Sequence, residues 1–160
     1  MAWVTFSIRK LTLKSRVNQL NYRMMQISQQ LQAQQRQGAY KIEMLQTNKN
    51  AVLENLDSQY NAQIQNLSNQ AQNAKKDKDK TNINNQITEL QQAQSAEKEY
   101  WTSLFERQEK QLTEENQRKE TALEMQQEQI QTQAEAAKAE YDSVKEACSS
   151  HIKDEAPKFV

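Results

Sequence analysis

The sequence predicts an all-α fold: a long antiparallel coiled-coil hairpin with two arms of similar length, packed into a helical oligomer. Three observations lead to this prediction. One glycine and one proline among 160 residues are too few for the turns of an ordinary globular domain. Apolar residues recur at helical spacing over most of the chain. The octet 75–82 at the midpoint is wholly polar and separates the two patterned halves.

An apolar lead-in is expected at residues 1–7, followed by the first helical arm at residues 8–74. This arm opens with a heptad seam, in which apolar residues alternate steps of four and three. The seam comprises Leu13, Val17, Leu20, Met24, Ile27 and Leu31. Gly38 then interrupts the apolar pattern. Because glycine costs about 1 kcal/mol relative to alanine inside a helix, we expect a kink or a break there.

Beyond Gly38 the apolar residues of both arms recur every 11 residues. The rows are Ile42, Leu53 and Ile64, then Leu45, Leu56 and Leu67, and in the second arm Leu90, Trp101, Leu112, Leu123 and Ala134. A second row in that arm holds Ile130, Tyr141 and Ile152. An 11-residue repeat predicts a nearly straight or slightly right-handed supercoil.

Residues 75–82 are predicted to form the bend, residues 83–156 the second arm and residues 157–160 a tail. Asp77 and Asp79 disfavour a helix interior, and Thr81 or Asn82 can cap the second arm. Pro157 ends the helix by residue 156. The alternative is one uninterrupted helix that pairs in parallel with a copy of itself.

Charge favours the hairpin over that alternative. Residues 1–74 carry eight basic and three acidic residues, whereas residues 83–160 carry nine basic and sixteen acidic residues. The first acidic residue is Glu43, so residues 1–42 contain seven positive charges and no negative one. A parallel pair would bring like charges together, while a hairpin brings the basic arm beside the acidic one.

Folding the chain at the bend pairs residues whose numbers sum to 157. In this register Leu67 meets Leu90, Leu56 meets Trp101, and Ile27 meets Ile130. The predicted hairpin seam comprises Val17, Leu20, Ile27, Leu45, Leu53, Leu56, Leu67, Leu90, Trp101, Leu104, Leu112, Leu123, Ile130 and Tyr141. The same register places Arg16 near Glu140 and Arg23 near Glu135. Other apolar residues lie off the seam: Tyr22, Met25, Met44, Tyr100, Phe105 and Met125. Phe105 widens the apolar stripe locally, as in bundles of more than two helices.

No catalytic, metal-binding or cofactor-binding residues are predicted. Cys148 and His151 lie one helical turn apart, but two ligands do not make a structural zinc site, and a nucleophile needs a pocket and an oxyanion donor. We therefore interpret this pair as a helix end and expect that the chain is not an enzyme. Although the first arm is basic, the chain lacks a nucleic-acid-reading motif, so the acidic second arm is its expected partner.

The ends of the chain provide the main functional signal. Folding the hairpin gathers an association patch at one end: Trp3, Val4, Phe6, Ile8, Ile152, Phe159 and Val160. A two-helix structure has little core there to bury them, and exposed apolar patches usually mark contacts. We therefore expect a non-catalytic structural subunit that self-assembles through its arms and its apolar termini into a filament, tube or ring wall. Another helical protein is a further candidate partner.

The alternative function is that of a peripheral membrane-associated or adaptor protein. Trp3, Phe6 and Ile8 lie beside Arg9 and Lys10, a combination typical of a helix that binds an anionic surface. The chain has no segment of membrane-spanning length and no secretory signal peptide. We therefore expect it in the cytoplasm or exported by a route that needs no such signal.

Overall fold

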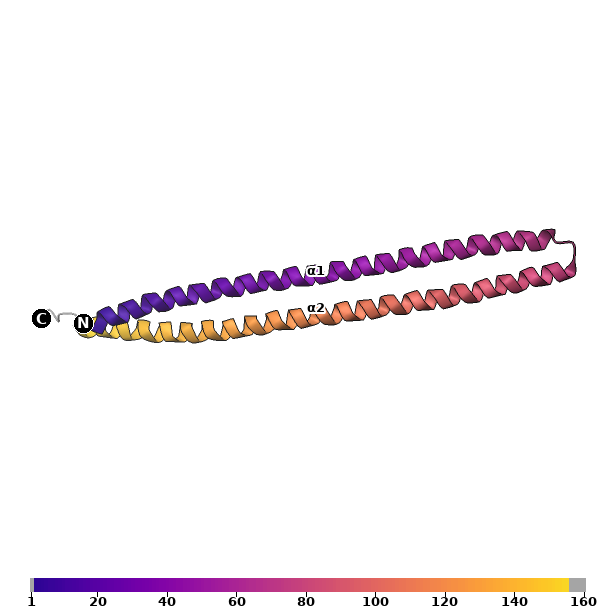
Figure 1. Ribbon diagram of the computed structural model, residues 1–160. Coiled ribbons are helices and arrows are strands. Elements are labelled where there is room, and N and C mark those ends of the chain that lie inside the picture. The colour runs from indigo at the N-terminus through magenta and orange to yellow at the C-terminus, as the bar shows by residue number, and fades with distance from the viewer. Residues whose placement is uncertain (1, 156–160) are drawn as a thin grey trace. The chain divides into compact units, whose positions relative to one another are not determined.

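A computed structural model describes the backbone of residues 2–155 and the side chains of residues 4–151. It contains two α-helices, α1 (Ala2–Asn73) and α2 (Asp77–Glu155), joined by residues 74–76. The helices run antiparallel and pack against each other, as predicted, to form a helical hairpin (Figure 1).

Helix α1 is longer at its start than the sequence predicts. It begins at Ala2, so most of the expected lead-in at residues 1–7 belongs to its first two turns. Val4 and Thr5 have only slightly lower helix propensity than their neighbours and do not break the helix. The helix also runs without a break through Gly38, because packing against α2 outweighs the intrinsic cost of this glycine.

The bend is shorter than the predicted octet 75–82. The backbone amides of Asp79 and Lys80 donate hydrogen bonds to the carbonyl oxygen of Lys76, at 3.1 and 3.2 Å, so α2 already begins at Asp77. Asp77 and Asp79 therefore lie in the first helical turn, where a negative charge interacts favourably with the helix dipole. Thr81 is not a cap, because its hydroxyl donates to the carbonyl oxygen of Asp77 at 3.0 Å.

The chain divides into two compact units, which we name by their place in the hairpin. The terminal unit contains Met1–Arg36 and Gln117–Val160, and the tip unit contains Gln37–Asn116. In the terminal unit the least exposed residues follow heptad steps in both helices. Its core is Leu20, Ala134 and Ala137, with Val17 and Ile130 packed against them. The terminal unit thus has the pattern of a left-handed coiled coil.

The tip unit follows the 11-residue repeat in both helices. Its least exposed rows include Gly38, Lys49, Tyr60 and Ala71 in α1 and Ile83, Gln94, Phe105 and Asn116 in α2. The prediction that this period extends along α2 through Ala134 is wrong, because burial beyond Asn116 follows heptad steps. Heptad spacing can also produce a separation of 11 residues, as two steps of four and one of three. Ile130 and Tyr141 are separated in this way, so their predicted row also fits the heptad pattern.

The register of the two helices lies within one helical turn of the predicted one. The rings of Phe6 and His151 stack with their centroids 5.4 Å apart, and the Tyr60 hydroxyl donates to Glu97 at 2.9 Å. Both pairs have residue numbers that sum to 157, as predicted. Every residue of the predicted hairpin seam is buried or half-buried. Phe105, which was predicted to lie off the seam, is buried within it.

The two periods meet where Gly38 packs against Asn116. Both residues are buried. A Cβ atom at position 38 would lie 2.7 Å from the amide nitrogen of Asn116 and 2.9 Å from its Cγ. Gly38 is therefore required because any larger residue would occupy the space of the Asn116 side chain.

An ion-pair cluster around Asp57 joins the helices in the tip unit, in addition to the ion pair of Lys49 with Glu106 at 3.9 Å. The Lys98 ammonium donates to both carboxylate oxygens of Asp57, at 2.8 and 2.9 Å, and the Gln94 side chain donates to the same carboxylate at 2.7 Å. The hydrogen bond from Lys98 holds the pKa of Asp57 below its ordinary value of 3.8, although desolvation opposes this shift. The hydrogen bond to Glu97 raises the pKa of Tyr60 above its ordinary value of 10.0.

The Gly38–Asn116 contact predicts that the effect of one substitution changes sign with its background. Gly38→Ala alone should lower the free energy of unfolding by about 1–3 kcal/mol, because the buried Asn116 side chain must move. In an Asn116→Ala background the same change should raise it by about 1 kcal/mol, because alanine is the better helix former. Urea unfolding followed by circular dichroism, at one protein concentration, measures both values. Stabilisation by Gly38→Ala in both backgrounds would contradict the tight contact.

The lowered pKa of Asp57 predicts a specific dependence of stability on pH. The ionised carboxylate stabilises the fold above the unfolded-state pKa, and this contribution is lost as the pH falls through the folded-state pKa. Asp57→Asn should therefore lose less stability than the wild type between about pH 5 and pH 2. Urea midpoints at both pH values test this. Glu54→Gln, which removes an exposed carboxylate outside the cluster, is the matched control and should behave like the wild type.

Candidate association surface

At the terminal end of the hairpin, two side chains of α1 turn towards α2. Phe6 is half-buried by its stacking on His151, with an angle of 26° between the ring planes. Ser7 lies 3.8 Å from the sulfur of Cys148, measured from its hydroxyl oxygen. Cys148 is therefore a buried residue of the seam, where the sequence suggested only a helix end. Phe6 closes its own hairpin and is not fully available to a partner.

The predicted association patch is otherwise only partly described. Val4 and Ile8 are exposed, and Ile8 retains 60% of its accessible surface. The side chains of Trp3, Ile152, Phe159 and Val160 lie outside the described residues. Among the described residues of the patch, the exposed ones are thus Val4 and Ile8 of α1.

Val4 and Ile8 begin a second heptad stripe that runs along the outside of α1. This outer stripe alternates steps of four and three and comprises Val4, Ile8, Leu11, Ser15, Asn18, Tyr22 and Met25. All seven residues are exposed, and the five apolar ones are large. On a helical wheel the outer stripe lies nearly opposite the seam residues Leu13, Val17 and Leu20. Helix α1 therefore has one apolar stripe that packs on α2 and a second one whose seven residues are all exposed.

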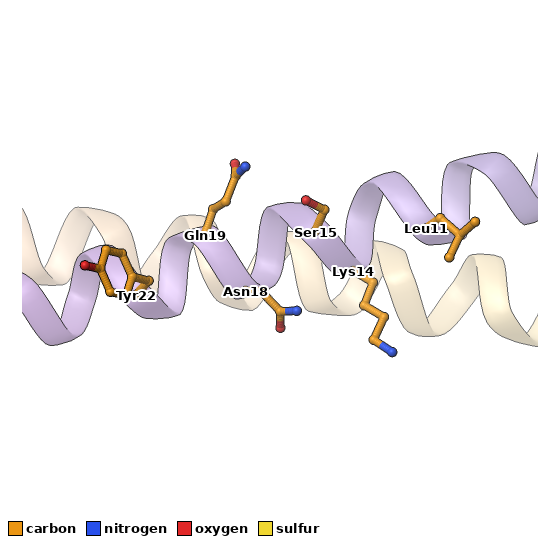
Figure 2. Close-up of a pocket in the computed structure, with 6 residues that line it drawn as sticks. All are labelled: Leu11, Lys14, Ser15, Asn18, Gln19 and Tyr22. Atoms are coloured by element: carbon orange, nitrogen blue, oxygen red, sulfur yellow. The ribbon is translucent and has the colours of Figure 1, made fainter.

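A shallow groove of about 450 Å³ lies on this second face (Figure 2). It is lined by Leu11, Lys14, Ser15, Asn18, Gln19 and Tyr22, all from α1. Leu11 and Tyr22 stand at its two ends, with the short side chains of Ser15 and Asn18 between them. In Figure 2 helix α2 lies behind α1, so the groove opens away from the hairpin seam.

Positive charges on α1 flank the seam and are incompletely neutralised among the described residues. Arg9 forms an ion pair with Glu140. Counted from the pair of Arg9 and Glu140, each step of seven residues along α1 corresponds to a step of seven residues back along α2. The residue opposite Arg16 is therefore Gln133, and the residue opposite Arg23 is Gln126. Accordingly Arg16 does not pair with Glu140 as predicted, and neither Arg16 nor Arg23 has an ion-pair partner among the described residues. Excess positive charge thus remains on α1 beside the seam, and Lys14 alone among the basic residues lines the groove of the outer stripe.

A second groove, of about 650 Å³, lies in the tip unit. Its lining includes the apolar residues Val52, Leu56, Trp101 and Phe105. Trp101 is only half-buried there, and its ring centroid lies 6.2 Å from that of Phe105. The seam is locally wider than one facing helix covers, which is the pattern expected where further helices pack.

Leu11, the most exposed large apolar residue of the outer stripe at 68%, was not predicted as a contact residue from the sequence. Tyr22 and Met25 were predicted only to lie outside the seam. A second count of alternating steps of four and three residues, begun at Val4 instead of at a seam residue, finds every residue of the outer stripe.

No helix of the described residues is long and apolar enough to span a membrane. Comparisons with family models, curated proteins and solved structures gave no match to this chain.

Proposed function

We propose that the chain is a non-catalytic structural coiled-coil subunit that self-assembles through the outer faces of its arms and its apolar terminal end. The outer stripe of α1 carries this proposal. Five large apolar side chains at heptad spacing are typical of a helix with a second helical neighbour. A filament, tube or ring wall is the form of assembly that we expect.

The energetics support association over solvent exposure. Burying one Val, Leu or Ile side chain contributes about 1.5–3 kcal/mol. Val4, Ile8 and Leu11 are all exposed at the terminal end. A contact that buries them therefore stabilises association by a free energy several times the thermal energy. The half-buried Trp101 and the groove beside it add a second site at which another helix can pack.

Self-assembly predicts that polar substitutions in the outer stripe act on association and not on folding. Ile8→Ser with Leu11→Ser should raise the concentration needed for assembly by about tenfold or more, because two apolar contacts are lost. Helicity should stay unchanged, since both side chains are exposed. Analytical ultracentrifugation with negative-stain microscopy measures the assembly.

Tyr40→Ser with Met44→Ser is the matched control for this experiment. Tyr40, like Ile8, is 60% exposed, and both control residues lie in the tip unit outside the outer stripe. The control should assemble nearly as the wild type does. A wild type that stays monomeric, or a stripe variant that assembles normally, would refute the proposal.

The alternative is a peripheral protein that binds an anionic membrane surface through the same face of α1. The observation that favours it is the combination of Val4, Ile8 and Leu11 with flanking Arg9 and Lys14, in a region without acidic residues. Such a helix lies in the interface with its apolar face in the lipid.

Liposome flotation separates the two functions. A membrane-binding protein should float with vesicles that contain anionic lipid, and this binding should weaken with salt and disappear when residues 1–10 are removed. A structural subunit should instead sediment without lipid as ordered assemblies. Flotation of monomers without any sedimenting assembly would favour the membrane function.

A further inference from the structure

From Ile8 to Met25, the outer stripe of α1 has the same order of side-chain types from either end. Two large apolar residues are followed by two short polar ones and then by two large apolar ones: Ile8, Leu11, Ser15, Asn18, Tyr22 and Met25. All six are exposed. The groove repeats this order in space, with Leu11 and Tyr22 at its two ends and the short residues between them (Figure 2). Such a face matches a copy of itself that runs in the opposite direction.

One register of two antiparallel copies brings like side chains together along this face. The steps between the six residues are three, four, three, four and three, which is the same sequence of steps from either end. When residue numbers that face each other sum to 33, Leu11 lies level with Tyr22 of the second copy. Ile8 then lies level with Met25, and Ser15 with Asn18. Apolar side chains thus meet apolar ones, and the hydroxyl of Ser15 lies beside an amide that can bond to it.

The other arrangements of the same face match less well. A shift by one heptad, to a sum of 26, sets Leu11 against Ser15 and Ile8 against Asn18, so that apolar side chains face polar ones. A parallel pair sets every residue against itself, which places a layer of two tyrosines one turn from a layer of two asparagines. The antiparallel register with a sum of 33 gives layers of more even size, which pack with fewer voids.

Charge does not oppose this contact. The positions that flank the six residues are Thr5, Thr12, Gln19 and Gln26 on one side and Ser7, Lys14, Asn21 and Ser28 on the other. Lys14 is the only charged residue among them, and the antiparallel register places it beside Asn21 of the second copy. The arginines of α1 lie beside the seam, on a different side of the helix. The contact therefore sets no charge directly opposite a like charge.

We infer that the outer stripe of α1 binds the same stripe of a second copy, antiparallel, about a two-fold axis between Ser15 and Asn18. This inference rests on the proposed self-assembly and names one of its contacts. A two-fold contact uses the same surface on both copies and closes on itself. It therefore produces a pair of hairpins, and growth into a ring or a filament uses a different surface.

Disulfide crosslinking between two variants tests the contact. One variant carries Ile8→Cys and the other Met25→Cys, both with Cys148→Ala so that no other thiol is present. In the two-fold pair, residue 8 of one copy lies level with residue 25 of the other, within the reach of a disulfide. Two copies of residue 8 lie about 25 Å apart along the axis, as do two copies of residue 25. An oxidised equimolar mixture should thus give at least about tenfold more crosslinked dimer than either variant alone.

Non-reducing electrophoresis measures the crosslinked dimer, and circular dichroism checks that each variant remains helical. Tyr40→Cys mixed with Met44→Cys, also with Cys148→Ala, is the matched control. Both control residues are exposed and lie outside the stripe, so their mixture should give no more dimer than either variant alone.

The outcomes separate this inference from the proposal on which it rests. A wild type that stays monomeric in sedimentation velocity would overturn both. Wild-type assembly without a crosslink in the Ile8→Cys and Met25→Cys mixture would overturn only the two-fold contact. Efficient crosslinking of each variant with itself would show a parallel contact and would overturn the antiparallel one. Flotation with anionic vesicles, without a crosslink, would assign the stripe to a membrane surface.

Discussion

Two antiparallel helices stay in contact along their length only if their buried stripes turn around the helix axes at the same rate. In this chain both helices change period at one contact, where Gly38 of α1 packs on Asn116 of α2. Heptad spacing on one side implies left-handed supercoiling, and the 11-residue repeat on the other implies a straight or slightly right-handed pair. A change in only one helix would carry its apolar residues out of the seam within a few turns.

The same contact fixes the register. Heptads are nearly equivalent to one another, so a seam of aliphatic residues alone could slide by seven residues at little cost. A slip would move Asn116 away from the only glycine in the chain and against a residue that leaves its side chain no space. A polar residue at one seam position is a known means of specifying register. The aliphatic seam residues hold the arms together, and the Gly38–Asn116 pair selects how they align.

The sequence was sufficient to predict the hairpin, because few turn-forming residues and two apolar periods leave little other choice. The bend was placed too broadly because Asp77 and Asp79 are poor in a helix interior but favourable in a first turn, and residue type alone does not reveal which applies. Phe105 was placed outside the seam because its neighbour Leu104 meets Leu53 in the predicted register, and only packing decides between neighbours. The outer stripe of α1 was not predicted because each helix was assumed to have only one apolar face.

The distribution of charge separates the folding of the hairpin from its proposed assembly. A basic arm beside an acidic arm favours folding, but the pairing within one chain is incomplete. The Arg9–Glu140 ion pair uses one member of the arginine row, while the heptad repeat sets glutamines opposite Arg16 and Arg23. Asp142 of α2 lines a small groove with Lys14 and Val17 of α1, so acidic residues of α2 also lie near the basic arm. The charge that remains unpaired on Arg16 and Arg23 among the described residues therefore flanks the seam, on a different side of α1 from the outer stripe.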